Sequence, residues 1–236
     1  MPPPFFSIPM NPANAMSSNE TITLPADFDL AQLGKVPLDA HHTRMLQLAR
    51  GTSGGAPAWR SRKEAEAYTL FALAQVSKRL AILFVDLRDD IRVHLIMRVP
   101  VPCLPDPAGP LRIEPAAELG LVYRQAGVIE PQPGYSVVCL LNPLHAWLAN
   151  IGPAETGQRI CLGISLFAGI RLNELLFMVY RALTLQTAQF DALDSAGVMN
   201  PAAAEWWQRN TDRIPLTTES FLSFGASKPS RPSSEA

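Results

Sequence analysis

The chain has 236 residues, of which 20 are basic and 21 acidic, and this balance excludes the strongly basic surface that nucleic-acid binding requires. A hydrophobic content of 47% with 17% charged residues excludes a disordered chain and predicts one domain with tails, or at most two small domains. Three cysteines without a Cys-x-x-Cys pair argue against a zinc ribbon or a disulfide framework, so we expect a reducing, cytoplasmic compartment.

The 22 prolines and the polar residues divide the chain into three parts. We expect a flexible arm rich in Pro, Asn and Ser over residues 1–35, a folded unit over 36–224, and a disordered polar tail over 225–236. No stretch reaches the roughly 18–20 apolar residues of a membrane span, so no membrane partner is expected. Residues 154–200 contain no proline and are free to form uninterrupted regular structure.

The first half of the folded unit is predicted to form two helices and a hairpin. Helices are expected over residues 38–50, ending at Gly51, and over residues 61–80, which carry an apolar face. The pattern then changes to period two around the polar turn Arg88-Asp89-Asp90, with apolar residues at Ile82, Phe84, Ile91, Val93, Leu95, Met97 and Val99. This alternation predicts a β-hairpin.

The middle of the chain is predicted to hold two further strands between irregular segments. Residues 100–115 are expected to form an irregular connection, because a central strand cannot absorb so many missing N–H donors. Strands are expected over residues 119–123 and 135–141, and a long irregular segment over 145–159 follows them.

Two helices are predicted in the last third of the folded unit. Residues 170–186 have the strongest helical pattern, with leucine or valine on one face at Leu172, Leu175, Leu176, Val179 and Leu183. A last helix is expected after Asn200, where Pro201 suits the first turn and residues 202–210 continue it. Because the strands are grouped before these helices, the order predicts an α+β layer structure and not an alternating doubly wound sheet.

The three cysteines differ in their surroundings. Cys139 lies in the apolar run Val137-Val138-Cys139-Leu140-Leu141, which is typical of a core residue, and Cys103 lies among prolines. Cys161 ends the irregular segment a few residues before the strongest helix. By its residue type alone it is either a small core residue or a nucleophile.

The string Gly157-x-x-Ile160-Cys161-Leu162, the long apolar helix after it and Asn200-Pro201-Ala-Ala-Ala-Glu-Trp-Trp-Gln-Arg-Asn210 together resemble the C-terminal half of ubiquitin-conjugating enzymes. In that family a glycine, a spacer, Ile-Cys-Leu, a crossover helix and a short helix opening with Asn-Pro occur in this order. The Cys-Leu-Gly form and the extended arm look most like the bacterial branch, which antiphage operons encode beside an activating enzyme, a ubiquitin-like protein and a deconjugating peptidase. The resemblance covers residues 140–210.

This resemblance implies the ubiquitin-conjugating (Ubc) fold, an antiparallel sheet with an N-terminal helix, a crossover helix and a C-terminal helix. It also implies that Cys161 accepts a ubiquitin-like protein from an activating-enzyme-like protein as a thioester and passes it to an amine of a target protein, without a cofactor. Such a carrier needs an accessible thiolate on a rigid platform. Because exchange between two thiols is nearly balanced, it needs no strong Cys–His pair.

The family stabilises the oxyanion of amine attack with the asparagine of a His-Pro-Asn segment about eight residues before the cysteine. This sequence departs from that pattern, because His145-Ala-Trp-Leu-Ala-Asn150 holds no contiguous triplet and Asn150 lies eleven positions before Cys161. We expect Asn150 to be the donor, with His145 as the second candidate. The alternative for Asn150 is a turn residue that hydrogen-bonds its own backbone.

Proton removal from the incoming amine is normally helped by an acidic residue near the end of the crossover helix. Asp194, with Asp191 beside it, occupies that region in Phe190-Asp-Ala-Leu-Asp-Ser195. The alternative for both carboxylates is a solvated turn.

Two other functions remain open. One is a catalytically inactive adaptor with the same fold, in which Cys161 is only structural. The other is a cysteine hydrolase that pairs Cys161 with His145 or His94, but such enzymes place the nucleophile at a helix N-terminus, whereas residues 163–169 separate Cys161 from its helix. The chain has four lysines against sixteen arginines, and we expect this low count to limit self-modification by a loaded enzyme.

Overall fold

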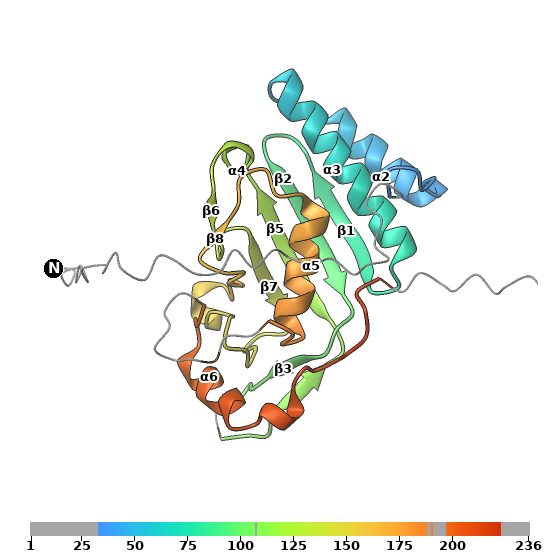
Figure 1. The fold of residues 1–236 in the computed structure, drawn as a ribbon. Coiled ribbons are helices and arrows are strands. Elements are labelled where there is room, and N and C mark those ends of the chain that lie inside the picture. The colour runs from blue at the N-terminus through green and yellow to red at the C-terminus, as the bar shows by residue number, and fades with distance from the viewer. Residues whose placement is uncertain (1–32, 107, 188–189, 191–196, 223–236) are drawn as a thin grey trace, which may run out of the picture.

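The computed structural model describes residues 33–106, 108–187, 190 and 197–222. Its centre is a four-stranded antiparallel sheet with the strand order β1-β2-β5-β7 (Figure 1). The strands of this sheet are β1 (Leu80–Asp86), β2 (Ile91–Met97), β5 (Ala117–Tyr123) and β7 (Val138–Asn142). Two short ribbons flank it, formed by β3 (Val101–Cys103) with β4 (Arg112–Glu114) and by β6 (Gln132–Pro133) with β8 (Ser165–Leu166).

Four longer helices surround the sheet, namely α2 (Ala40–Gly51), α3 (Pro57–Val76), α5 (Leu172–Leu183) and α6 (Pro201–Gln208). In Figure 1, α5 lies across one face of the sheet, α2 and α3 lie beside its β1 edge, and α6 lies at the end of the sheet near β3. Single turns occur at α4 (Ala126–Ile129), η2 (Ala154–Thr156) and η3 (Thr211–Arg213). The prediction of an α+β fold with an antiparallel sheet is therefore confirmed.

The predicted helices are all present, with shifted ends. α2 begins after Asp39, whose carboxylate accepts a hydrogen bond from the backbone N–H of His42 at 2.8 Å. α3 begins at Pro57 and not at residue 61, because proline suits the first helical position, where no N–H is needed. It ends at Val76 and not at residue 80, because Leu80 pairs with Met97 in the sheet.

The hairpin of β1 and β2 buries the predicted apolar face. Alternate residues of β2 lie in the core, and they are Ile91, Val93, Leu95 and Met97. On the other face of the sheet His94 Nε2 lies 2.6 Å from Oε1 of Glu118 on β5. His94 is therefore engaged by a carboxylate of the neighbouring strand.

The prediction of a wholly irregular connection over residues 100–115 is wrong in part. This stretch contains β3 and β4, in which Pro102 pairs with Ile113. Pro102 is accommodated because this ribbon lies outside the main sheet. The carbonyl oxygen of Pro102 accepts the backbone N–H of Trp147 at 2.7 Å. The N–H group that Pro102 lacks therefore removes no hydrogen bond from the four-stranded sheet.

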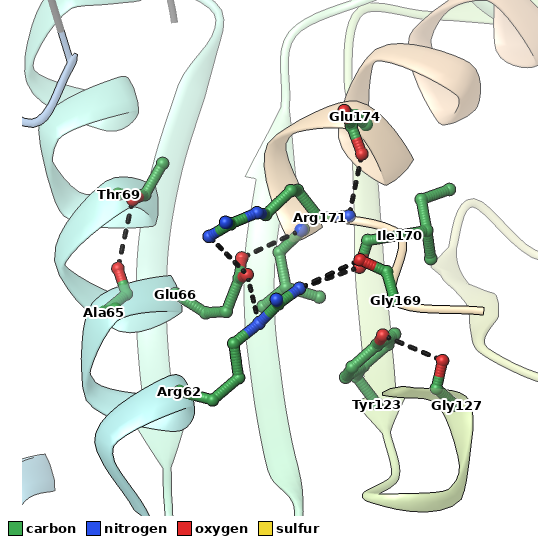
Figure 2. Close-up of polar contacts among 11 residues, drawn as sticks. Arg62, Ala65, Glu66, Thr69, Tyr123, Gly127, Gly169, Ile170, Arg171 and Glu174 are labelled. Carbon is green, nitrogen blue, oxygen red and sulfur yellow. Dashed lines mark hydrogen bonds and ion pairs between the residues drawn. The ribbon is translucent and has the colours of Figure 1, made fainter. Parts of the chain in front are cut away.

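A buried carboxylate joins α3 to the start of α5 (Figure 2). Glu66 on α3 accepts the backbone N–H of Leu172 at 2.9 Å through Oε2. Its Oε1 lies 2.7 Å from Nε of Arg62, as an ion pair without hydrogen-bond alignment, and 3.6 Å from Nη1 of Arg171. Since the first N–H groups of a helix have no partner within the helix, Glu66 caps α5 and holds it against α3.

The predicted limits of the folded unit fall close to the described residues. Leu33 is buried in the core, so the packed structure includes a residue of the predicted arm 1–35. The rest of that arm and the predicted tail 225–236 lie outside the described residues. No helix within the described ranges combines the length and apolarity needed to cross a bilayer.

Candidate functional site

Cys161 lies in a short extended segment that continues the sheet beyond β7. On one side of this segment the N–H of Ile160 donates to the carbonyl oxygen of Val138 on β7 at 3.0 Å. On the other side the N–H of Cys161 donates to the carbonyl oxygen of Asn150 at 2.8 Å. Ile160 also forms an antiparallel bridge with Ile151, and both isoleucines are fully buried. The thiol-bearing residue is therefore held opposite Asn150 by ladder pairing on a rigid platform.

The thiol of Cys161 is largely enclosed. The residue is 8% exposed, and its Sγ lies 3.4 Å from the carbonyl oxygen of Gly163, to which the thiol donates. Burial raises the pKa of the Cys161 thiol, because a thiolate is disfavoured away from water, and the Gly163 contact opposes this only in part. The surroundings of Cys161 therefore favour the thiol over the thiolate.

The side chain of Asn150 is the unusual polar group of this site. Asn150 is 8% exposed, and its Oδ1 is buried without a hydrogen-bond partner among the described residues. A buried amide oxygen left unpaired costs about 1–3 kcal/mol. An unsatisfied buried acceptor of this kind calls for an explanation, and it can accept a hydrogen bond from a bound ligand.

The chain before Asn150 is attached to the last helix. The carbonyl oxygen of Ala149 accepts the backbone N–H groups of Met199 and Asn200, at 2.8 and 3.0 Å. The indole N–H of Trp207 on α6 donates to the carbonyl oxygen of Trp147 at 2.7 Å. The predicted helix after Asn200 therefore has a definite role, since it fixes the segment that leads into Asn150.

The turn after Cys161 packs against the loop before β7. The N–H of Leu162 donates to the carbonyl oxygen of Gly134 at 3.2 Å, and the N–H of Gly134 donates to that of Ile164 at 3.4 Å. A β-carbon on Gly134 would overlap the backbone of Gly163. The close approach of these two backbones requires glycine at position 134 and sets the path of the chain on the far side of the thiol.

The predicted site residues have different outcomes. Asn150 is placed directly opposite Cys161. His145 is exposed, with a backbone φ of 58°, and its carbonyl oxygen accepts the N–H of Leu104 at 2.9 Å, which holds it against the end of β3. Asp191 and Asp194 lie outside the described residues.

Sequence reasoning missed Gln158, which lies three residues before Cys161 and is 1% exposed. Its amide bonds to backbone groups of the segment that precedes Asn150. No local pattern marks this residue, because its partners lie 12 to 18 positions away, on β7 and on the loop after it.

Within the described ranges, no group of three or more His, Cys, Asp or Glu side chains is placed to hold a metal ion. Chemically, the arrangement offers a thiol and, on the residue paired with it through the backbone, a buried side-chain amide, which are residue types of an acyl-transfer site. No family profile matches the chain, and neither a curated protein nor a solved structure matches it.

Proposed function

We propose that this chain is a ubiquitin-conjugating-type enzyme of the bacterial branch, with the Ubc fold. It accepts a ubiquitin-like protein from an activating-enzyme-like partner as a thioester on Cys161 and transfers it to an amine of a target protein, in the cytoplasm and in antiphage defence. The proposal rests on the sequence resemblance over residues 140–210 and on one structural relationship, the pairing of Cys161 with Asn150.

Loading exchanges one thioester for another. The Cys161 thiolate attacks the carbonyl carbon of the ubiquitin-like protein on the activating enzyme, a C–S bond forms at Cys161, and the departing thiolate of the activating enzyme takes up a proton. Because reactant and product are both thioesters, the step is nearly balanced, and a thiol with a raised pKa can still be loaded.

Transfer places more demand on the site. The neutral amine of the target attacks the thioester carbon, the resulting oxyanion collapses, and the C–S bond to Cys161 breaks. The proton that the amine loses is taken up by the departing Cys161 thiolate. A single well-placed donor to such an oxyanion contributes about 2.7–4 kcal/mol. The backbone of Asn150 pairs with that of Cys161, and we assign the N–H group of its side-chain amide to this role.

The pairing of Cys161 with Asn150 supports this function because it brings together two residues that are eleven positions apart. The family places its own asparagine close to the cysteine by a shorter spacing. Here the additional residues are taken up by the single turn η2 and by the left-handed Gly157, which has a φ of 81°. The longer spacing is thus compatible with the same chemical partnership.

The test is formation of a thioester. The full chain is incubated with ATP and with the activating-enzyme-like and ubiquitin-like proteins of the same operon, and a reductant-sensitive adduct is expected. Cys161→Ala should abolish the adduct, and Cys161→Ser should convert it to an ester that resists reductant and is cleaved by hydroxylamine.

Cys139→Ala is the matched control. The Cys139 thiol also donates to a backbone carbonyl, that of Gly120 at 3.5 Å, and burial also raises its pKa. Cys139 pairs with Arg159, two residues from Cys161. The comparison therefore tests whether the thioester forms on Cys161 itself or on any nearby buried thiol. An adduct that survives in Cys161→Ala but is lost in Cys139→Ala would show that Cys139 carries the thioester, and it would overturn the proposal.

A catalytically inactive adaptor with the same fold is the second candidate. The observation that favours it is the burial of Cys161 together with the raised pKa of its thiol, because an accessible thiolate is what a carrier needs. If no adduct forms, yet the chain still binds the ubiquitin-like protein equally well with Cys161 and with Cys161→Ala, the adaptor function holds.

A further inference from the structure

We infer that Gln158 is a positioning residue that holds Asn150 opposite Cys161. The inference rests on the proposed function for its catalytic consequence, but its structural content can be tested separately. It concerns a buried amide that makes no contact with a reacting atom and acts through the backbone of the loop before Asn150.

Gln158 is turned toward the interior by the backbone around it. It follows Gly157 and itself has a φ of 43°, in the left-handed region that side chains other than glycine rarely adopt. Its carbonyl oxygen accepts the N–H of Leu140 at 2.9 Å, which anchors it to β7. The strained conformation is held by these neighbours and directs a polar side chain into the protein, where it is 1% exposed.

The amide of Gln158 bonds to three backbone groups, two on the loop after β7 and one on β7 itself. Its Oε1 accepts the N–H of Ala146 at 2.9 Å. Its Nε2 donates to the carbonyl oxygens of Pro143 and Leu140, at 2.9 and 3.3 Å. Both amide hydrogens are therefore used, and the loop after β7 receives from one side chain the pairing that a neighbouring strand would otherwise give.

This loop leads directly to the candidate donor. Ala146 lies four residues before Asn150, and Gln158 lies three residues before Cys161. The same side chain thus connects the segment that carries the thiol to the segment that carries the Asn150 amide, in addition to the Cys161–Asn150 hydrogen bond. Without it, the loop from Pro143 to Ala146 has buried backbone groups to satisfy and is free to shift.

A small shift matters for transfer more than for loading. Misplacement of a catalytic group by about 1 Å can reduce a rate by about 10²-fold. Loading is the nearly balanced exchange of thioesters, whereas amine attack depends on a donor aimed at the oxyanion. Loss of the Gln158 amide should therefore slow discharge of the thioester and leave loading little changed.

The structural test is amide hydrogen exchange in Gln158→Met, which keeps the side-chain length and removes the hydrogen bonds. The Cys161 and Gly152 amides, whose partners are Asn150 and Arg159, should exchange about tenfold faster or more, relative to the amides of β2, which report global unfolding. A uniform acceleration across the sheet, or none at Cys161, would show that Gln158 does not set this pairing.

The functional test measures loading and single-turnover discharge to free lysine in the full chain. In Gln158→Met, discharge should fall about 10²-fold, with loading within about threefold of the parent chain. Equal losses in both steps, or normal discharge despite faster exchange at Cys161, would overturn the positioning role.

Gln75→Met is the control for both measurements. Gln75 likewise bridges two backbone groups, donating to the carbonyl oxygen of Pro37 and accepting the N–H of Asp39, but it joins α3 to the chain before α2. It should leave exchange at Cys161 and discharge unchanged. If the parent chain forms no thioester, the proposed function fails, and the exchange measurement alone still decides whether Gln158 holds Asn150 in place.

Discussion

The backbone N–H of Cys161 donates to the carbonyl oxygen of Asn150 at 2.8 Å, so the two residues are direct partners across a short antiparallel pairing. The hydrogen bond fixes the main chains and leaves the side chain of Asn150 with a buried Oδ1 that no described group satisfies. A protein that needed Asn150 only as a turn residue would gain by bonding that oxygen locally. The buried Oδ1 is an acceptor that can receive a hydrogen bond from a donor such as an attacking amine, whereas the oxyanion role that we propose belongs to the amide N–H group.

Replacement of Asn150 by alanine should slow thioester discharge to an amine about 10²–10³-fold, as expected for loss of one oxyanion donor. Loading of Cys161 should change much less, because exchange between thiols is nearly balanced. Single-turnover discharge and loading assays measure the two steps separately. Asn210→Ala is the control, since the Asn210 side chain donates to the backbone carbonyl oxygen of Trp206 on α6, away from Cys161 in the sequence. Equal discharge rates in the two variants would remove Asn150 from the mechanism.

The reactivity of Cys161 should increase with pH well into the alkaline range. Burial raises the pKa of its thiol above the ordinary value of 9.0, and only the thiolate attacks an alkylating reagent. The rate of iodoacetamide addition at Cys161, followed by peptide mass spectrometry, should therefore still be rising at about pH 9. A plateau below about pH 7 would show a thiolate stabilised by its surroundings and would favour the cysteine hydrolase.

The sequence predicts those parts of the fold that depend on local pattern. The face of α5 and the alternation of β2 follow from residue spacing, and Asn200 and Pro201 mark the start of α6 through their preference for helix beginnings. The family resemblance predicts Asn150 as the oxyanion donor, but not its backbone pairing with Cys161. Residue spacing alone does not specify how the loop between them folds back.

Contacts between distant segments could not be predicted in this way. Glu66 caps Leu172 across 106 positions, and Gln158 bonds to Pro143 across 15. Each depends on how separate elements pack, and neither leaves a periodic trace in the sequence. Both residues are buried, although polar residues of these types are expected at the surface from composition and hydrophobic pattern.

Glu66→Ala should lower the free energy of unfolding by about 3–5 kcal/mol, because it uncaps α5 and leaves the Arg62 guanidinium without its carboxylate partner. Arg171→Ala should cost less than about 1 kcal/mol, because its side chain is 56% exposed and lies 3.6 Å from the same carboxylate. Urea denaturation of both variants measures the difference. Similar losses would show that Glu66 contributes through its exposed pairing and not through the buried cap.

Among the lysines that the structure describes, self-modification of the loaded enzyme should avoid Lys63 and fall on Lys35 or Lys78. Lys63 is fully buried, and its Nζ donates to the carbonyl oxygens of Leu87, Arg88 and Asp89. Burial lowers the pKa of Lys63, which favours the neutral amine, but the enclosed amine cannot reach a thioester. Mass spectrometry of adducts after prolonged loading identifies the acceptors. Modification of Lys63 as abundant as that of the exposed Lys78 would contradict this ordering.

Gly134→Ala should disturb the turn beside Cys161. The added methyl group would overlap the backbone of Gly163, whose carbonyl oxygen accepts the Cys161 thiol, so the turn must move. We expect a loss of about 1–3 kcal/mol in the free energy of unfolding, typical of overpacking, and faster alkylation of Cys161 as its cover opens.

Gly51→Ala is the matched control for this change. A β-carbon on Gly51 meets no atom within 4 Å, and the residue ends α2 with an ordinary helical backbone, so alanine there should stabilise the protein by about 0.4–1 kcal/mol. Alkylation of Cys161 should be the same in Gly51→Ala as in the parent chain. If Gly134→Ala also left stability and alkylation unchanged, the turn at Gly163 would be free to relax, and the thiol would not depend on it for its enclosure.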